Sequence, residues 1–380
     1  MKKIISVFLA LVMVLSLAVM GYASEEKELR FNSDGTFKIM QINDTQDVGK
    51  RVNKKMIEFI EAALDKEEPD LVVFVGDQLS DVYPFGKAED MKKALENILV
   101  PLKERDIPFL MTLGNHDYDH FEKFSLEEQA AVYTSFENCY ASTDGNDPFT
   151  YNVPVKTADG ENIAFNIYMM DTHAYAETGG YAGVNETQVQ WYKDTSAALK
   201  AQNGANVVPS MLFQHIPPKE IYSLLKVCKY NEEGAVYTKY DKSWYKLDET
   251  KAQGQLGEAP CSEDFDNITG QYEAWVECGD IMGAFFAHDH VNTFVGTTDE
   301  GIVMGYNGGT GFRTYGSGSE RSVRIFEYKE DEVENYETRL LTYSELTGKS
   351  FKVTINDIFT PSLLTHVMRV VYFLFGWIID

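Results

Sequence analysis

Short apolar segments that each end in a polar residue recur along this chain, and this recurrence constrains the fold more than any other feature. Leu71–Val75 is wholly apolar and ends at Gly76-Asp77, and residues 37–42 run into a polar stretch that contains Asp44. A short, wholly apolar run is typical of a strand that is covered on both faces. Residues 56–64 carry apolar side chains at helical spacing. Strands that alternate with helices predict an α/β domain.

Six predicted strands deliver an Asp, Asn, Gln or His at their carboxyl ends. These strands are residues 37–42, 71–75, 107–113, 163–170, 211–213 and 281–286. Five of the seven histidines follow such strands, namely His116, His173, His215, His288 and His290. In open α/β sheets, ligands bind in the crevice beyond these strand ends. The sequence therefore predicts one polar site, built by loops that are far apart in the chain.

The side chains at these positions suit divalent metals. Asp, Asn, Gln and His favour Mn, Fe(II) or Zn, and no cysteine lies at ligand spacing. A carboxylate shared by two ions lets them approach to about 4 Å, and a water between them loses a proton near neutral pH. A nearby imidazole can protonate a leaving alkoxide. These residues therefore predict a hydrolase with two metal ions that acts on phosphate esters.

The motifs occur in a definite order, which is Asp44-x-Gln46, Gly76-Asp77, Gly114-Asn115-His116-Asp117, Gln214-His215 and His288-Asp289-His290. This order resembles that of the calcineurin-like metallophosphoesterase superfamily. Residues 69–78 and 287–292 are similar to its purple-acid-phosphatase-29-like branch, and the resemblance covers about residues 36–330. It implies a four-layer αββα sandwich, in which helices flank two facing sheets and a dimetal centre lies at the sheet edge.

The resemblance also implies a role for each motif. The first metal would be held by Asp44, Gln46 and His290. The second metal would be held by Asn115, His215 and His288. Asp77 would bridge both ions. The general acid that meets the leaving group would be His116, oriented by Asp117.

Three positions depart from the family pattern. Gln46 stands where the first motif usually has His, and because an amide oxygen is a weaker ligand, we expect looser binding of the first metal. Ser80 stands where purple enzymes have the Tyr that binds Fe(III), so a purple iron enzyme is not expected. Ala287 replaces a Gly, which is a minor steric change.

Two further loops carry polar residues whose role the sequence leaves open. Arg313 lies in the glycine-rich loop 305–316. Its guanidinium could contact substrate phosphate, although turn geometry alone explains the glycines. Asp171 and His173 mimic the missing Asp-x-His motif, but the family has a non-ligand Asp at this place. A role at the pocket edge or in the structure is predicted for both.

The ends of the chain differ from its middle. Lys2, Lys3, an apolar run and the small residues before position 24 predict a signal peptide, residues 1–23, and a secreted protein; an uncleaved membrane anchor is the alternative. The domain is expected over residues 30–350, with an aperiodic surface insertion at 231–266. Residues 360–380 predict an apolar helix that packs on the domain, in a dimer or on a membrane surface. The uninterrupted apolar run of this predicted helix is only ten residues long, 370–379, which is short for a bilayer span.

The excess of acidic residues argues against nucleic acid as a partner. Acidic residues outnumber basic ones by 59 to 34, for a net charge of −25, and such a surface repels nucleic-acid backbones. Four cysteines permit two disulfides in three connectivities, or buried thiols.

The expected function is hydrolysis of a small phosphomonoester or diester by attack of metal-bound hydroxide, outside the cell or at its surface. A nucleotidase or cyclic phosphodiesterase is the alternative within the enzymes, because pocket walls rather than metal ligands set substrate choice. A non-catalytic surface binding protein on a decayed phosphatase fold is the alternative outside them, and it is the reading that the substitution at Gln46 favours.

Overall fold

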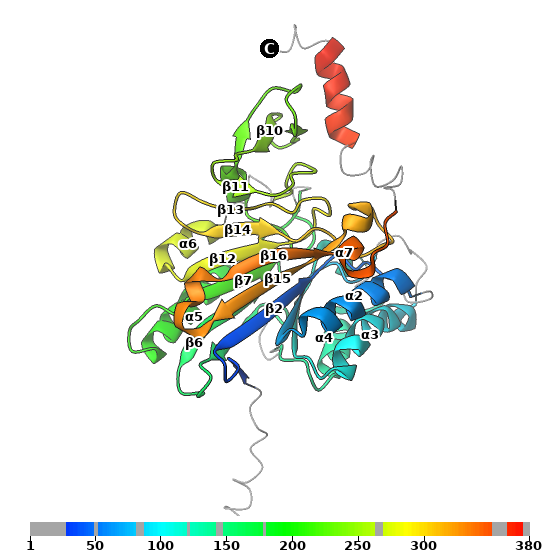
Figure 1. The fold of residues 1–380 in the computed structure, drawn as a ribbon. Coiled ribbons are helices and arrows are strands. Elements are labelled where there is room, and N and C mark those ends of the chain that lie inside the picture. Colours follow the sequence, from blue (N-terminus) through cyan, green and yellow to red (C-terminus); the bar gives the residue numbers. More distant parts are fainter. Residues whose placement is uncertain are drawn as a thin grey trace, which may run out of the picture.

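The computed structural model describes residues 28–48, 52–80, 87–119, 122–141, 147–177, 180–262, 269–351 and 363–374. Within these ranges two sheets face each other, and helices cover their outer faces (Figure 1). The predicted α/β class and αββα sandwich are therefore confirmed. The predicted signal peptide, residues 1–23, lies outside the described residues.

The smaller of the two facing sheets has five strands and contains the first three motif strands. Its order is β16 (Glu337–Thr342), β15 (Ser322–Lys329), β2 (Thr36–Ile42), β3 (Leu71–Val75) and β4 (Phe109–Thr112). β2, β3 and β4 are parallel, so their carboxyl ends share one edge. β15 runs antiparallel to β2 and β16.

The larger sheet has eight strands and contains the last three motif strands. Its order is β1 (Leu29–Arg30), β5 (Tyr151–Lys156), β6 (Ile163–Met170), β7 (Ser210–Gln214), β12 (Ile281–Phe286), β14 (Val303–Tyr306), β13 (Val295–Thr297) and β11 (Ala252–Gln253). β6, β7, β12 and β14 are parallel. Six predicted strands are thus present, and β4 is shorter than the expected range 107–113.

Alternating side chains explain the layers. Val72 and Phe74 of β3 pack in the core under the helices, whereas Leu71, Val73 and Val75 pack against the other sheet. Because both faces are covered, the strand is apolar throughout. The helices on the two outer faces are α2 (Lys54–Glu67), α3 (Ala88–Glu104), α4 (Leu126–Thr134) and α7 (Tyr343–Thr347) on one side, and α5 (Glu186–Gln202) and α6 (Gln271–Cys278) on the other.

Of the predicted insertion, residues 231–266, the structure describes residues 231–262, and this part is not wholly a surface feature. β9 (Val236–Tyr237) and β10 (Trp244–Leu247) form a separate small sheet with β8 (Leu225–Val227). Glu258 and Cys261 of the insertion are buried. The N–H of Glu258 donates to Asn292 at 3.1 Å, and the N–H of Cys261 donates to Asp289 at 3.0 Å. The insertion therefore reaches the last motif loop.

No disulfide joins the four cysteines, all of which lie in the described ranges.

Residues 363–374 form the predicted C-terminal helix, which packs on the small sheet (Figure 1). Thr365 accepts the N–H of Tyr237 at 3.0 Å, and Arg369 donates to the carbonyl of Ala235 at 2.7 Å. Apolar side chains of the helix that remain exposed are Leu363, Leu364, Val367, Val370, Phe373 and Leu374. Within the described part of the chain, every helix is too short or too polar to cross a bilayer.

Candidate metal centre

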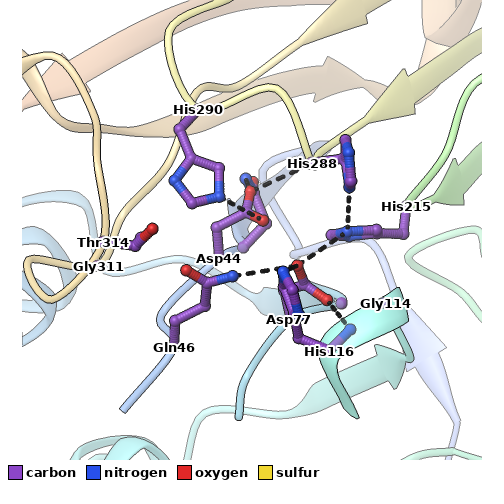
Figure 2. Close-up of polar contacts among 12 residues, drawn as sticks. Asp44, Gln46, Asp77, Gly114, His116, His215, His288, His290, Gly311 and Thr314 are labelled. Carbon is purple, nitrogen blue, oxygen red and sulfur yellow. Dashed lines mark hydrogen bonds and ion pairs between the residues drawn. The ribbon is translucent and has the colours of Figure 1, made fainter. Parts of the chain in front are cut away.

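Loops from both sheets meet at one edge of the sandwich and bring the seven predicted ligands together. Figure 2 labels all of them except Asn115. The loops after β2, β3 and β4 supply Asp44, Gln46, Asp77 and Asn115. The loops after β7 and β12 supply His215, His288 and His290. Six of these side chains are buried, and that of His288 is half-buried. The structure thus places them in one cluster, and their metal ligation stays a prediction.

The second-metal cluster, which comprises Asn115, His215 and His288, lies close to Asp77. His215 Nε2 is 3.3 Å from Asp77 Oδ2. His288 Nδ1 is 3.3 Å from His215 Nε2 and 2.8 Å from Asn115 Oδ1. One ligand atom each from Asp77, His215 and His288 lie within 4.8 Å of one another. His215 Nδ1 donates to the Val75 carbonyl at 2.9 Å, which fixes the tautomer and leaves Nε2 as the ligand atom.

The first-metal cluster comprises Asp44, Gln46 and His290. His290 Nε2 is 3.3 Å from Asp44 Oδ1. Gln46 Nε2 donates to Asp77 Oδ2 at 3.2 Å, and Figure 2 shows this amide directed at Asp77. Asp44 is fully buried, and its Oδ1 accepts no hydrogen bond from the described residues, because the neutral His290 ring carries its proton on Nδ1, which donates to the Tyr315 carbonyl. A buried carboxylate oxygen left in this way is costly unless a cation lies beside it, so these residues fit a divalent cation.

Four predicted ligands have a backbone conformation that non-glycine residues rarely adopt. The angle φ is +52°, +41°, +54° and +71° at Asp44, Gln46, Asp77 and His288. Such conformations cost about 1–3 kcal/mol each and cluster at functional sites. The loops are also closely packed, because a Cβ added at Gly114 would lie 2.3 Å from Asp77 Oδ1. Side chains with ligand atoms are thus retained where glycine would be less strained, which favours a binding site over plain turns.

The charges of the cluster shift the pKa values of Asp77 and His215 in opposite directions. Burial would raise the pKa of Asp77, but the charges of His215 and His116 outweigh it and hold the pKa below its usual range. Burial would lower the pKa of His215, but the Asp77 carboxylate raises it to about 9. Burial and the charge of His215 lower the pKa of His288 to about 3. In the metal-free protein a proton on His215 therefore balances Asp77, and a metal ion bound there would displace it.

His116, the predicted general acid, lies beside Asp77 with its side chain 23% exposed. Its Nε2 is 4.0 Å from Asp77 Oδ2, and its Nδ1 is 2.7 Å from Asp119 Oδ2. The prediction that Asp117 orients this ring is wrong, because Asp119 is its carboxylate partner. The turn Asn115–Asp117 is a 3₁₀ helix, and its i to i+3 bonding continues to Asp119, whose N–H donates to the His116 carbonyl at 3.2 Å. Side chains three residues apart are aligned in such a turn. Sequence adjacency to His116 therefore pointed to the wrong carboxylate.

Asp117 instead holds the loops that carry the ligands. Its buried carboxylate accepts the N–H groups of Asp77, Leu79 and Gly114 at 2.8, 2.9 and 2.9 Å. Burial and the neighbouring charge of Asp77 raise the pKa of Asp117 to about 7. Asp117 is thus a positioning residue for the loop of Asp77.

His290 is supported by two residues that the sequence analysis missed. Its Nδ1 donates to the Tyr315 carbonyl at 2.9 Å, and the Tyr315 ring stacks on the imidazole with centroids 4.3 Å apart and planes 7° apart. The Tyr315 hydroxyl donates to Glu258 at 3.0 Å. Burial, together with the charge of Asp289, raises the pKa of Glu258 well above its usual range. The glycine-rich loop was the only signal for Tyr315, and Glu258 lies in the aperiodic insertion.

Arg313 and the pair Asp171 and His173 lie beside the cluster. Arg313 Nε donates to the buried carboxylate of Asp47 at 2.6 Å, which ties the glycine-rich loop to the loop of the first motif; its contact with phosphate stays a prediction. Asp171 accepts the hydroxyl of Tyr118 and, at 2.8 Å, the N–H of His173. These contacts agree with the edge or structural role expected of Asp171 and His173.

Comparison with known proteins identifies the family. The family model described as calcineurin-like phosphoesterase matches residues 37–292, which is more than half of the chain. The chain belongs to the calcineurin-like phosphoesterase family. The motif order had predicted this superfamily, and the relatives of this calcineurin-like phosphoesterase include the predicted branch.

Two relatives and one solved structure illustrate the likeness. The chain is 26% identical over 364 residues to "Probable inactive purple acid phosphatase 14" of Arabidopsis thaliana, covering 86% of this chain and 83% of the relative. It is 27% identical over 353 residues to "Phosphatase DCR2" of Saccharomyces cerevisiae, covering 85% of this chain and 56% of the relative. The solved structure of GAP50, the anchor in the inner membrane complex of Plasmodium, matches with a TM-score of 0.48 and 10% identity, covering 87% of this chain and 94% of that one.

Proposed function

We propose that this calcineurin-like phosphoesterase is a secreted enzyme that hydrolyses phosphomonoesters or diesters with two divalent metal ions. The observation that carries the proposal is the position of Asp77 between two sets of ligands. Its Oδ2 is 3.3 Å from His215 Nε2 and 3.2 Å from Gln46 Nε2, so one carboxylate faces both clusters. Carboxylate, amide and imidazole ligands without a thiolate suit Mn, Fe or Zn.

In the proposed hydrolysis, the metal ions and the protein side chains have different roles. When bound, two such ions lower the pKa of a water and offset negative charge on the phosphoryl oxygens. His116 lies at the exposed side of the cluster, where it can give a proton to the oxygen of the departing alcohol. Asp119 accepts from Nδ1 of His116 at 2.7 Å, which leaves Nε2 as the nitrogen that transfers the proton.

Hydrolysis assays test this proposal. The protein is supplied with Mn, Fe or Zn and given 4-nitrophenyl phosphate, bis(4-nitrophenyl) phosphate, a nucleoside monophosphate and a cyclic nucleotide. We expect turnover of at least one ester, and loss of that turnover when a chelator removes the metal. The preferred ester separates a general monoesterase from a diesterase, a nucleotidase or a cyclic phosphodiesterase. A protein that holds two ions and hydrolyses none of these esters would contradict the proposal.

A non-catalytic binding protein on a phosphatase fold is the second candidate. Two observations favour it: the Arabidopsis relatives are named as probable inactive phosphatases, and Gln46 replaces a stronger ligand. Metal analysis of the pure protein discriminates the two. Two ions per chain support the enzyme, and none supports the binding protein.

The location of the protein is part of the proposal. The signal-peptide pattern of residues 1–23 supports export, and the exposed apolar side chains of residues 363–374 support contact with a membrane surface or a second copy. Truncation before residue 360 followed by cell fractionation tests this. A membrane contact predicts release of the truncated protein, whereas a dimer contact predicts a change in its oligomeric state.

A further inference from the structure

Two tyrosines extend outward from the second-metal cluster. Tyr175 and Tyr181, in the segment after β6, pair through an isolated antiparallel bridge. The Tyr181 ring meets the His288 ring edge to face, with centroids 4.5 Å apart and planes at 75°. The Tyr175 ring stacks on that of Tyr181, with centroids 5.8 Å apart and planes at 26°. A series of aromatic rings therefore leads from a predicted metal ligand toward solvent.

Tyr175 also touches the turn that carries His116. Asn115 Nδ2 donates to the Tyr175 hydroxyl at 3.4 Å, and His116 is the next residue of the chain. In the proposed reaction the leaving alcohol receives its proton from His116, so we expect it to pass the turn that Tyr175 contacts through Asn115. The stack on Tyr181 orients the ring, and the hydroxyl contact places it beside Asn115.

The exposure of Tyr175 separates it from a packing residue. Tyr181 is half-buried, whereas 56% of Tyr175 is exposed. Packing of the segment after β6 accounts for Tyr181, but it does not require a large aromatic ring at position 175. An oriented ring with accessible surface beside a catalytic cluster can stack on a planar ligand.

We propose that Tyr175 determines specificity by stacking on an aromatic leaving group, such as an aryl or nucleobase-bearing alcohol. This inference rests on the proposed phosphoesterase function and names the substrate class of that site. Aromatic stacking of this kind favours an aromatic over an aliphatic ligand by about 3- to 10-fold.

Binding of two phosphonates tests the inference. Phenylphosphonate and methylphosphonate carry the same charged group and differ in the ring, so the ratio of their Kd values isolates the ring contact. Calorimetry on the Mn-loaded full chain is expected to show tighter binding of phenylphosphonate by about 3- to 10-fold. Tyr175→Ala and Tyr175→Leu should bring the ratio close to one. Tyr175→Phe should keep the ratio, because the ring stacks and the hydroxyl does not.

The outcomes separate this inference from the proposed function. An unchanged Kd for methylphosphonate in all variants shows that the metal centre is intact. If both phosphonates bind and Tyr175→Ala keeps the wild-type ratio, or if the wild type shows no preference, Tyr175 has no such role and the proposed function stands. If neither phosphonate binds the Mn-loaded wild type, the proposed function fails and this inference fails with it.

Discussion

The two halves of the candidate metal centre lie at the same sheet edge but have different predicted ligands. In the second-metal cluster, contacts of 2.8 to 3.3 Å connect Asn115, His288 and His215 to Asp77. In the first-metal cluster, Asp44 and His290 are 3.3 Å apart, and Gln46 directs its amide nitrogen at Asp77. The second half thus has two imidazoles and the Asn115 amide, whereas the first half has one imidazole, the Asp44 carboxylate and the amide of Gln46 in place of the usual second imidazole. We therefore expect one tightly and one weakly bound ion.

This difference predicts that contacts around the ligands matter more in the half that contains Gln46. Tyr315 stacks on His290 and is itself held by Glu258. Groups that orient a metal-ligating histidine commonly change metal affinity by about 10–100-fold. We therefore expect the proposed first metal site to depend on the fixed orientation of His290, which would offset the weak ligand Gln46.

Replacing Asp77 should have the largest effect, because this carboxylate serves both halves. We expect Asp77→Asn to lose both ions and to reduce turnover to background. Metal analysis and an ester hydrolysis assay measure the two effects. Asp65→Asn, which changes an exposed carboxylate on α2 paired with Arg105, is the control and should keep both ions. An Asp77→Asn protein with wild-type turnover would refute the shared carboxylate.

Replacing His116 should affect catalysis and leave the binding of both ions unchanged. For an alkyl phosphate, His116→Asn should lower kcat by about 10²–10⁴-fold, because the poor leaving group needs a proton. The loss should be much smaller for 4-nitrophenyl phosphate, whose leaving group is stable as an anion. Both ions should remain. An equal loss for both esters would show that His116 is not the general acid.

Replacing Tyr315 should weaken one half of the centre selectively. Tyr315→Leu removes the ring that stacks on His290, and we expect about 10–100-fold weaker binding of the first metal. Tyr315→Phe keeps the ring, loses the hydrogen bond to Glu258 and should have a smaller effect. Calorimetric titration with Mn measures both sites. Equal weakening of the two sites by Tyr315→Leu would contradict the assignment of Tyr315 to the first metal.

Replacing Gln46 should reduce the difference between the halves. Gln46→His supplies the imidazole that the family usually has at this position, so the first metal should bind more tightly, by about tenfold or less. The same titration, compared with Gln46→Ala, measures the change. Tighter binding in Gln46→Ala than in the wild type would show that Gln46 is not a ligand.

Stability should depend on pH in opposite ways with and without metal. The pKa of His215 is raised from 6.5 to about 9 in the metal-free protein. The contribution of this protonated histidine to the free energy of unfolding is therefore complete below pH 6.5 and is lost as the pH rises through 9. Metal binding needs the deprotonated imidazole. The increase in Tm caused by Mn should therefore be greater at pH 9 than at pH 6 in scanning calorimetry. A smaller increase at pH 9 would contradict this coupling.

The strands and the clustering of the seven polar residues could be predicted from local patterns. The apolar run Leu71–Val75 predicts a buried strand. Asp77 follows this strand, so it lies at the edge where the parallel strands have their carboxyl ends. The supporting residues could not be predicted in this way. The choice of Asp119 over Asp117 depends on the 3₁₀ geometry of one turn. The position of Glu258 depends on hydrogen bonds to Asn292, which lies 34 residues later, and no periodic pattern encodes such contacts.

The most direct test of the central claim is anomalous diffraction from crystals of the Mn-loaded protein. We expect two peaks about 4 Å apart, with the Asp77 carboxylate between them. One peak should lie beside Asp44 and His290, and the other beside His215 and His288. A single peak, or two peaks of which only one contacts Asp77, would contradict the account.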